Sequence, residues 1–179
     1  MESHNSVLEF WFNELSQKDW FVKNTELDKK ISSRFHDLHL SASKGELFEW
    51  RKTPEGRVAE IIVLDQFSRN MFRGTAQAFA YDAMALVLAQ EIVLFNLDRA
   101  LPLLYRGFAY MPYMHSESLV IHQEAVKLFA LPGLEENLKF EMLHKEIIEK
   151  FGRYPHRNEI LGRTSTPEEM EFMKTHSGF

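Results

Sequence analysis

Apolar residues recur at helical spacing through almost the whole chain, and this pattern constrains the fold more than any other feature. Within Thr25–Ala42, for example, Leu27, Ile31 and Phe35 stand four residues apart and would share one face of a helix. No segment shows the apolar–polar alternation of a half-buried strand. We therefore predict an all-α protein, built as an array of antiparallel helix hairpins or as a bundle.

Capping signals predict where several helices begin. Thr53 followed by Pro54 is typical of an N-cap and a first helical residue, and Thr166-Pro167 with Glu169 predicts a capping box. Pro102 and Pro112 are expected to break the chain in a kinked region. The expected helices cover residues 6–16, 25–42, 53–72, 75–93, 116–129, 134–151 and 166–175.

Composition narrows the functional classes. The 179 residues fit a single domain over positions 1–179, and the absence of cysteine excludes disulfides, thiolate catalysis and cysteine-based metal sites. A net charge of −5 disfavours a nucleic-acid partner. The longest apolar run, Ala83–Ala89, is far shorter than the roughly 20 residues that a membrane-spanning helix needs. Residues 1–10 lack the basic region of a secretory signal peptide. We expect a cytoplasmic protein with no membrane partner and no cofactor; the sequence does not indicate its oligomeric state.

Three polar strings, the first and third of them rich in arginine, interrupt the apolar helical pattern: Leu64–Gly74, Tyr110–Ser118 and Phe151–Thr166. Each mixes Arg or His with acids and aromatic residues, and the first and third also with amides, at a density that a solvated surface does not require. Polar groups near a core must find partners, because an unpaired buried polar group is costly. Their partners are therefore one another or a ligand.

The first string places charges on a helix face that otherwise turns toward the core. At 100° per residue, the apolar stripe of this helix continues through Asp65, Arg69 and Arg73. Asp65 and Arg69 form an i,i+4 pair in the favourable order. One interpretation is an internal ion pair that joins helices; the other is that Arg69 and Arg73 hold an anion while Asp65 orients them.

The third string carries three arginines against one glutamate, although the whole chain is acidic. Its glycines and proline predict a loop, and guanidinium groups with backbone donors are suited to phosphate or carboxylate. The alternative is that the loop is latched to acids on the helices. Those acids would be Asp65, Asp82 and Glu117.

Histidines offer candidate acid–base groups. His144 lies on an apolar face of the helix predicted at 134–151, where a histidine is either a hydrogen-bonded core residue or a base in a cavity. His115 and Glu117 stand beside the predicted start of the helix at Ser116. No metal-ligand spacing, phosphate-binding glycine loop or serine-nucleophile motif appears, so we expect no metal site.

Segments that include these strings resemble a known protein family. In order, VLEFWF (Val7–Phe12), LDQFSRNMFRGTAQAFAYD (Leu64–Asp82), YMPYMHSE (Tyr110–Glu117) and FGRYPHRNEILGRTST (Phe151–Thr166) resemble the bacterial family known as domain of unknown function 924. The similarity runs over nearly the whole chain. It implies an all-helical fold of the tetratricopeptide-like type, and it implies neither an activity nor a catalytic residue.

The leading hypothesis is one polar pocket that binds a small anionic molecule or an acidic peptide terminus. Its candidate ligand-binding residues are Asp65, Arg69, Asn70, Arg73, Asp82, Arg153, His156, Arg157, Asn158 and Arg163. A second hypothesis is a hydrolase or lyase in which His115 or His144 pairs with Glu117 or Asp65. Two further readings remain: a peptide- or protein-interaction module, and strings that only build the fold.

Overall fold

The computed structural model describes residues 2–176 and Gly178, and these residues form helices, turns and loops without a β-strand among them. The all-α prediction is therefore confirmed. The α-helices are α1 (His4–Glu9), α2 (Gln17–Phe21), α3 (Thr25–Ser43), α4 (Pro54–Ile61), α5 (Ser68–Met71), α6 (Asp82–Leu94), α7 (Leu103–Met114), α8 (Leu119–Phe129), α9 (Glu135–Phe151) and α10 (Pro167–Met173). Two π-helical segments, η1 (Phe10–Glu14) and η3 (Ile62–Phe67), and four 3₁₀ helices, η2 (Phe48–Lys52), η4 (Ala76–Phe79), η5 (Leu97–Ala100) and η6 (Pro155–Arg157), complete the described elements.

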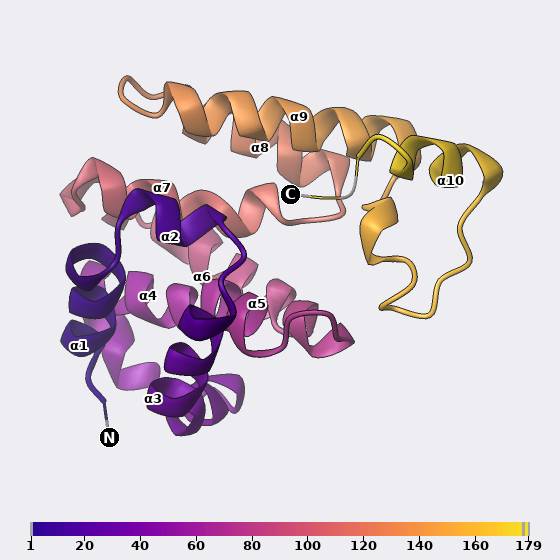
Figure 1. Ribbon diagram of the computed structural model, residues 1–179. Coiled ribbons are helices and arrows are strands. Elements are labelled where there is room, and N and C mark those ends of the chain that lie inside the picture. The colour runs from indigo at the N-terminus through magenta and orange to yellow at the C-terminus, as the bar shows by residue number, and fades with distance from the viewer. Residues whose placement is uncertain (1, 177, 179) are drawn as a thin grey trace.

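Neighbours in sequence are mostly neighbours in space. α7 packs against both α6 and α8, and α8 packs against α9. Figure 1 shows α8 and α9 together along one side of the molecule, with α10 beyond the end of α9. This order of contacts suits an array of helix hairpins. The tetratricopeptide-like arrangement in particular stays a prediction, as does the single domain over residues 1–179.

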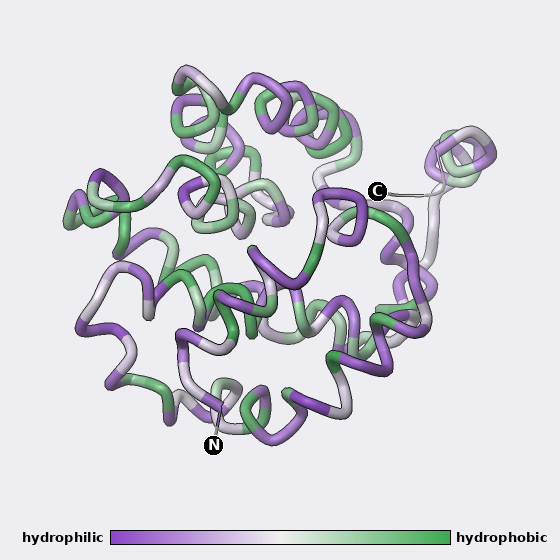
Figure 2. The backbone as a smooth tube through the Cα atoms, turned by 60° about the vertical axis from the view of Figure 1, so that its left-hand side comes forward, coloured by the Kyte–Doolittle hydropathy of each residue, from purple (hydrophilic) through white to green (hydrophobic). Residues whose placement is uncertain are grey.

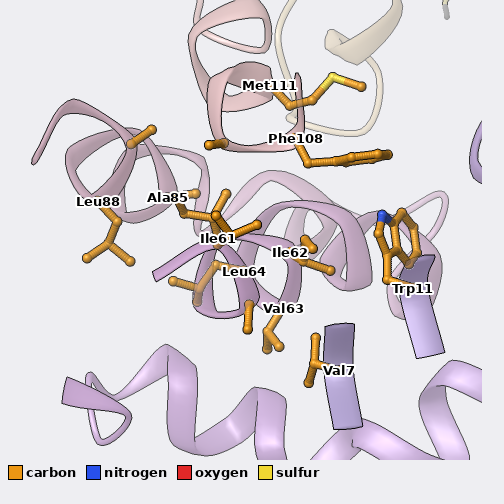
Figure 3. Packing of buried hydrophobic residues seen from close by; sticks show 14 of the residues in the cluster. Val7, Trp11, Ile61, Ile62, Val63, Leu64, Ala85, Leu88, Phe108 and Met111 are labelled. Atoms are coloured by element: carbon orange, nitrogen blue, oxygen red, sulfur yellow. The ribbon is translucent and has the colours of Figure 1, made fainter. Parts of the chain in front are cut away.

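The core is built around the helix that α4 and η3 form together. Its residues Ile61–Leu64 are fully buried at four consecutive positions, so this helix has no solvated face there. Figure 3 shows them surrounded by Ala85 and Leu88 of α6, Phe108 of α7 and Trp11 of η1. A helix that is enclosed on every side carries its polar residues into the interior as well.

The helix predicted over residues 53–72 is continuous but not regular. Thr53 caps it as expected, accepting the N–H of Gly56 at 3.1 Å. The π-helical turns of η3 then add residues to each turn, which shifts the faces of everything downstream relative to an ideal wheel. Phe72 ends the helix, so Arg73 lies past its last turn and does not share a direction with Arg69.

Two other predicted helices begin later than expected. The helix predicted at 75–93 is divided into η4 and α6, because the Thr75 hydroxyl donates to the carbonyl of Phe72 instead of capping a helix. Pro112 does not break α7, which runs on to Met114, and α8 begins at Leu119. Proline in the last turn costs α7 little, since only two helical residues follow it. His115–Ser118 is consequently a turn between helices.

Both ends of the helical array follow the sequence signals closely. α1 and η1 form the predicted aromatic helix at 6–16, with Phe10 and Trp11 buried. Thr166 and Glu169 make the predicted capping box at the start of α10. Figure 2 shows hydrophobic and hydrophilic residues alternating along most helices, as expected for helices with one buried face.

One described stretch, Ala76–Leu94, is long and apolar enough to cross a membrane by length and composition alone, and 28% of it is buried. It contains η4 and α6, and α6 packs on α4 and α7. Asp82 within it is ion-paired with Arg69. Within this stretch α6 has one buried face and keeps an unusually apolar outer face.

Candidate functional site

A recess of about 340 Å³ lies between the η4–α6 segment, the α7–α8 turn and the loop that follows α9. Its polar residues are Asp82, His115, Ser116, Glu117 and Arg157. His115, Ser116 and Glu117 belong to the second string and Arg157 to the third, whereas Asp82 follows the first string and no residue of Leu64–Gly74 lines the recess. That this recess is the predicted anion pocket stays a prediction.

His115 is oriented by a buried carboxylate. Its Nδ1 lies 2.7 Å from Oδ1 of Asp65, a residue with no exposed surface. A carboxylate only accepts hydrogen bonds, so Nδ1 carries the proton and Nε2 keeps a free lone pair. No hydrogen bond of the described residues uses Nε2, and the ring lines the recess. The Gln66 amide donates to the other Asp65 oxygen at 2.6 Å and completes the support.

Two arginines share the acids at this site. Arg69 donates to both oxygens of Asp82, at 2.9 and 3.1 Å, and also lies 3.0 Å from Oδ1 of Asp65. Arg157 reaches Asp82 at 3.2 Å and donates to the carbonyl oxygen of His115 at 3.0 Å. Two cations thus face two anions. Of the bonds between Arg157 and the acids, an incoming anion would have to replace only a single, long hydrogen bond to Asp82.

The guanidinium of Arg157 is held between two rings and is 6% exposed. Its centre lies 4.4 Å from the ring of Phe79 and 4.6 Å from that of Tyr154, both suitable for cation–π attraction. Its Nε has no hydrogen-bond partner among the described residues. A buried donor without a partner is uncommon in folded proteins.

Burial and charge set the protonation states. Burial, followed by the positive charge of Arg69, lowers the pKa of His115, so the ring is neutral at pH 7. Burial alone would raise the pKa of Asp65, but the charge of Arg69 and the contact with His115 outweigh it and hold that pKa below its usual range. A neutral imidazole beside an ionised carboxylate has the chemistry of a general base.

Glu117 also lines the recess but is fully engaged by the loop after α9. Both of its oxygens accept from Arg163, at 2.7 and 2.9 Å, and Oε1 accepts the N–H of Tyr154 at 2.6 Å. Burial works to raise the pKa of Glu117, while the hydrogen bond with Arg163 lowers it, and the net shift is downward. Glu117 is therefore an ionised latch for the loop.

The comparisons with known proteins agree with one another. The sequence profile of the family described as bacterial protein of unknown function (DUF924) matches residues 7–177. The chain belongs to this family. Its structure is similar to that of a protein of unknown function from Agrobacterium tumefaciens, with 37% identity, 97% of each chain covered and a TM-score of 0.90. Among functionally curated proteins, none matches this chain.

Membership of the DUF924 family agrees with the observed fold, but it names no reaction. The chemistry therefore has to be inferred from the residues of the recess.

Several predicted site residues lie outside the recess. Arg73 donates to both oxygens of Asp28 on α3, at 2.7 and 2.8 Å, and Asn70 donates to the same carboxylate at 2.8 Å. These contacts tie the end of α5 to the start of α3. They leave neither residue available to the anion site that the sequence predicts.

Arg153 and Asn158 also serve the loop itself. Arg153 pairs with Glu169 at the start of α10, at 2.7 and 2.8 Å, and Asn158 donates to the same residue at 3.2 Å. The Arg153 hydrogen bond lowers the pKa of Glu169 to about 2. Asn158 further accepts from Arg163 at 2.9 Å. The alternative interpretation of this string was a loop latched to acids on the helices, and Arg153 does pair with a helix acid, although this acid is Glu169 of α10 and not Asp65, Asp82 or Glu117.

His144 and His156 lie near the recess without lining it. Nδ1 of His144 contacts the carbonyl oxygen of Phe140 at 2.7 Å, and its ring stands edge-on to Tyr154, with centroids 5.7 Å apart. Burial lowers the pKa of His144 to about 3 and that of His156 to about 4. The structure thus brings His115 to a carboxylate within the recess.

One buried pair escaped the sequence-based prediction. His122 of α8 and Glu141 of α9 are fully buried, and His122 Nδ1 lies 2.7 Å from Glu141. His122 Nε2 lies 2.8 Å from the carbonyl oxygen of Ser116, so this nitrogen carries a proton. The signal was present: Glu141 precedes His144 by three residues and Ile148 by seven, and is therefore a charge on the inward stripe of α9.

Other polar pairs offer neither a nucleophile nor a metal centre. The Ser68 hydroxyl donates to the carbonyl of Leu64 at 2.6 Å, so His39, 2.7 Å away, donates to the hydroxyl and cannot activate it. Within residues 2–176 and Gly178, no three His, Asp or Glu side chains are grouped as metal ligands.

Proposed function

We propose that the recess is an active site for general acid–base chemistry on a small substrate. In this proposal Nε2 of His115 accepts a proton from the substrate or from water, and Asp65 keeps the ring in the required tautomer. Arg157 pairs with a negatively charged group of the substrate. The reaction class is hydrolysis or elimination, because both begin with removal of a proton by a positioned base.

The single observation that carries this proposal is the 2.7 Å contact between His115 and Asp65 at the wall of the recess. An orienting carboxylate on one ring nitrogen and a free lone pair on the other are the two requirements of a histidine base. The lowered pKa of His115 supports the same role, since a base must be neutral before it acts.

The role of Arg157 is supported by its unpartnered Nε and by its weak attachment to Asp82. Arg69 is a poorer candidate because Asp82 and Asp65 already hold it from two sides. The fold offers no matching observation for a peptide-interaction groove, so that alternative stays a prediction.

The first test asks whether Nε2 of His115 is accessible and unprotonated. Diethyl pyrocarbonate acylates accessible, neutral imidazoles, and peptide mass spectrometry locates the modified ring. We expect modification at His115 and at exposed His36, and not at buried His39. Inorganic phosphate should protect His115 while leaving His36 reactive. A protein in which His115 resists the reagent at every pH would refute the proposed base.

The second test is a panel of small esters, phosphate esters and hydroxy acids. Any activity of the wild type should fall by about 10²-fold or more in His115→Gln, because general-base catalysis is typically worth that much. His36→Gln is the matched control and should retain full activity. Activity that survives in a folded His115→Gln variant would rule out the proposed role.

A further inference from the structure

The walls of the recess differ sharply in chemistry. Except for Asp82, its polar groups all come from the α7–α8 turn and from the loop after α9. The opposite wall is apolar and comes from η4 and α6. Its side chains are Ala76, Phe79, Ala80, Ala83 and Leu86.

Small residues make this wall hollow. Ala76, Ala80 and Ala83 all line it, although they come from η4, from the turn after it and from α6. Ala80 and Ala83 are exposed, so neither is small because the core demands it. The space in front of them belongs to the recess.

Apolar residues also stand on the outer face of α6 beyond the recess. Val87 follows Ala83 by four residues and is 56% exposed, and Leu94, one heptad further and beyond Gln90 and Glu91, is 73% exposed. A soluble helix usually turns polar residues outward at such positions. From Ala83 to Leu94 this face would extend about 16 Å at the helical rise of 1.5 Å per residue.

We infer that the substrate is an amphiphile, whose anionic end pairs with Arg157 beside His115 and whose hydrocarbon part lies on the alanine wall. This inference rests on the proposed function for the position of the anionic end. A carboxylate and a phosphate monoester both fit Arg157, and the structure assigns the hydrocarbon part independently of that choice. A wholly polar substrate would leave the alanine wall in water and gain nothing from it.

The test is a homologous series of probes: acetate, butyrate, hexanoate and octanoate, with the matching alkyl phosphates, all below the concentrations at which they aggregate. Calorimetry should give a Kd that falls by up to about fourfold for each added methylene, the value for complete burial of a CH₂ group. The carboxylate and alkyl phosphate series differ only in the head group, so the series that binds more tightly identifies the head group that the recess prefers.

Two variants separate the ends of the ligand. Ala83→Trp should abolish the dependence on chain length, because the indole fills the wall. Ala100→Trp, at an exposed alanine of η5 outside the recess, should behave as wild type. Arg157→Met should weaken every member of the series by the same factor.

Three results would overturn the inference. Equal affinity for acetate and octanoate in the wild type, with binding still dependent on Arg157, would refute the apolar subsite and spare the proposed function. Binding that ignores Arg157, or no binding in either series, would refute both the subsite and the anion role of Arg157. Flotation with phosphatidylglycerol vesicles that persists in Ala83→Trp would show that the apolar face of α6 docks on lipid surfaces instead.

Discussion

His115 and Asp65 stand 50 residues apart in the chain, yet one hydrogen bond of 2.7 Å joins Nδ1 of the imidazole to Oδ1 of the carboxylate. The carboxylate is buried, and Arg69 supplies the nearest positive charge. This pair is both the centre of the candidate site and a structural junction. Changes at it should therefore affect stability as well as chemistry.

Replacing Asp65 with Asn keeps the shape of the side chain and removes its charge. Arg69 retains Asp82 but loses one of its two counter-charges. We expect the free energy of unfolding to fall by about 3 kcal/mol, at the lower end of the range for breaking a buried ion pair. Urea denaturation followed by circular dichroism measures it. A variant as stable as the wild type would mean that Asp82 alone compensates Arg69.

Arg69 and Arg73 form a matched pair of variants. Arg69→Met leaves the buried Asp65 without its cation and leaves Asp82 with Arg157 alone, so the free energy of unfolding should fall by about 3–5 kcal/mol. Arg73→Met breaks an ion pair with Asp28 in which the arginine is 36% exposed, and about 1 kcal/mol or less is expected. Equal losses in the two variants would contradict the difference in burial on which this prediction depends.

The pair of Glu117 and Arg163 should control how firmly the loop after α9 is held. In Glu117→Gln the amide of Tyr154, which donates to the carboxylate, should exchange faster with deuterium. A double-mutant cycle with Arg163→Gln should give a coupling energy of about 1–2 kcal/mol, as for hydrogen bonds between charged groups. Lys139→Gln, which breaks an exposed pair, is the control and should leave the loop unchanged.

Histidine burial predicts that stability declines in mild acid. Burial lowers the pKa of His39 to about 4, of His144 to about 3 and of His156 to about 4, while an unfolded chain binds these protons near pH 6.5. The unfolded state thus holds more protons between about pH 6.5 and 4, so the free energy of unfolding falls as the pH falls. Each such ring contributes at most about 1.4 kcal/mol per pH unit.

Chemical denaturation at a series of pH values measures this slope. His39→Leu removes one of the buried rings and should make the slope smaller. A free energy of unfolding that is constant between pH 7 and 5 would contradict the burial of these rings.

Two glycines predict opposite effects of the same substitution. At Gly56 an added Cβ would stand 2.0 Å from the carbonyl oxygen of Trp50, so Gly56→Ala should destabilise the protein despite the better helix propensity of alanine. At Gly107 the Cβ would meet Asn137 at an ordinary 3.6 Å. Gly107→Ala should therefore raise the free energy of unfolding by about 0.5–1 kcal/mol. Thermal melts of both variants test the pair, and the same sign in both would refute the close approach at Gly56.

The sequence could predict helices wherever local chemistry decides them. The caps at Thr53 and Thr166 are local, and they appear where expected. The inward stripe of α9 keeps His144 and Ile147 but is turned toward Glu141 and Ile148, so that Phe140 and Leu143, expected on it, are exposed. The π-helical turns of η3 are different, because they depend on packing around a helix that is buried on all sides. An ideal wheel cannot anticipate that shift, and it therefore placed Arg73 beside Arg69.

The membership of the candidate site was predictable only in part. Dense polar strings inside apolar sequence pointed to His115 and Arg157, which line the recess. The choice of partners was not predictable, since Asp28 takes Arg73 and Glu169 takes Arg153 through contacts made by the folded chain. Helix periodicity gives the face of a residue, whereas tertiary packing decides which neighbour it meets.

The distance along the chain between the segments that line the recess also imposes an order on its assembly during translation. Glu117 leaves the ribosome well before Arg163, the cation that contacts it in the finished protein. Until then the growing chain must keep this carboxylate hydrated, which opposes early collapse around it. Synthesis of the last arginine therefore completes the electrostatics of the site and removes the obstacle to closing the core beside it.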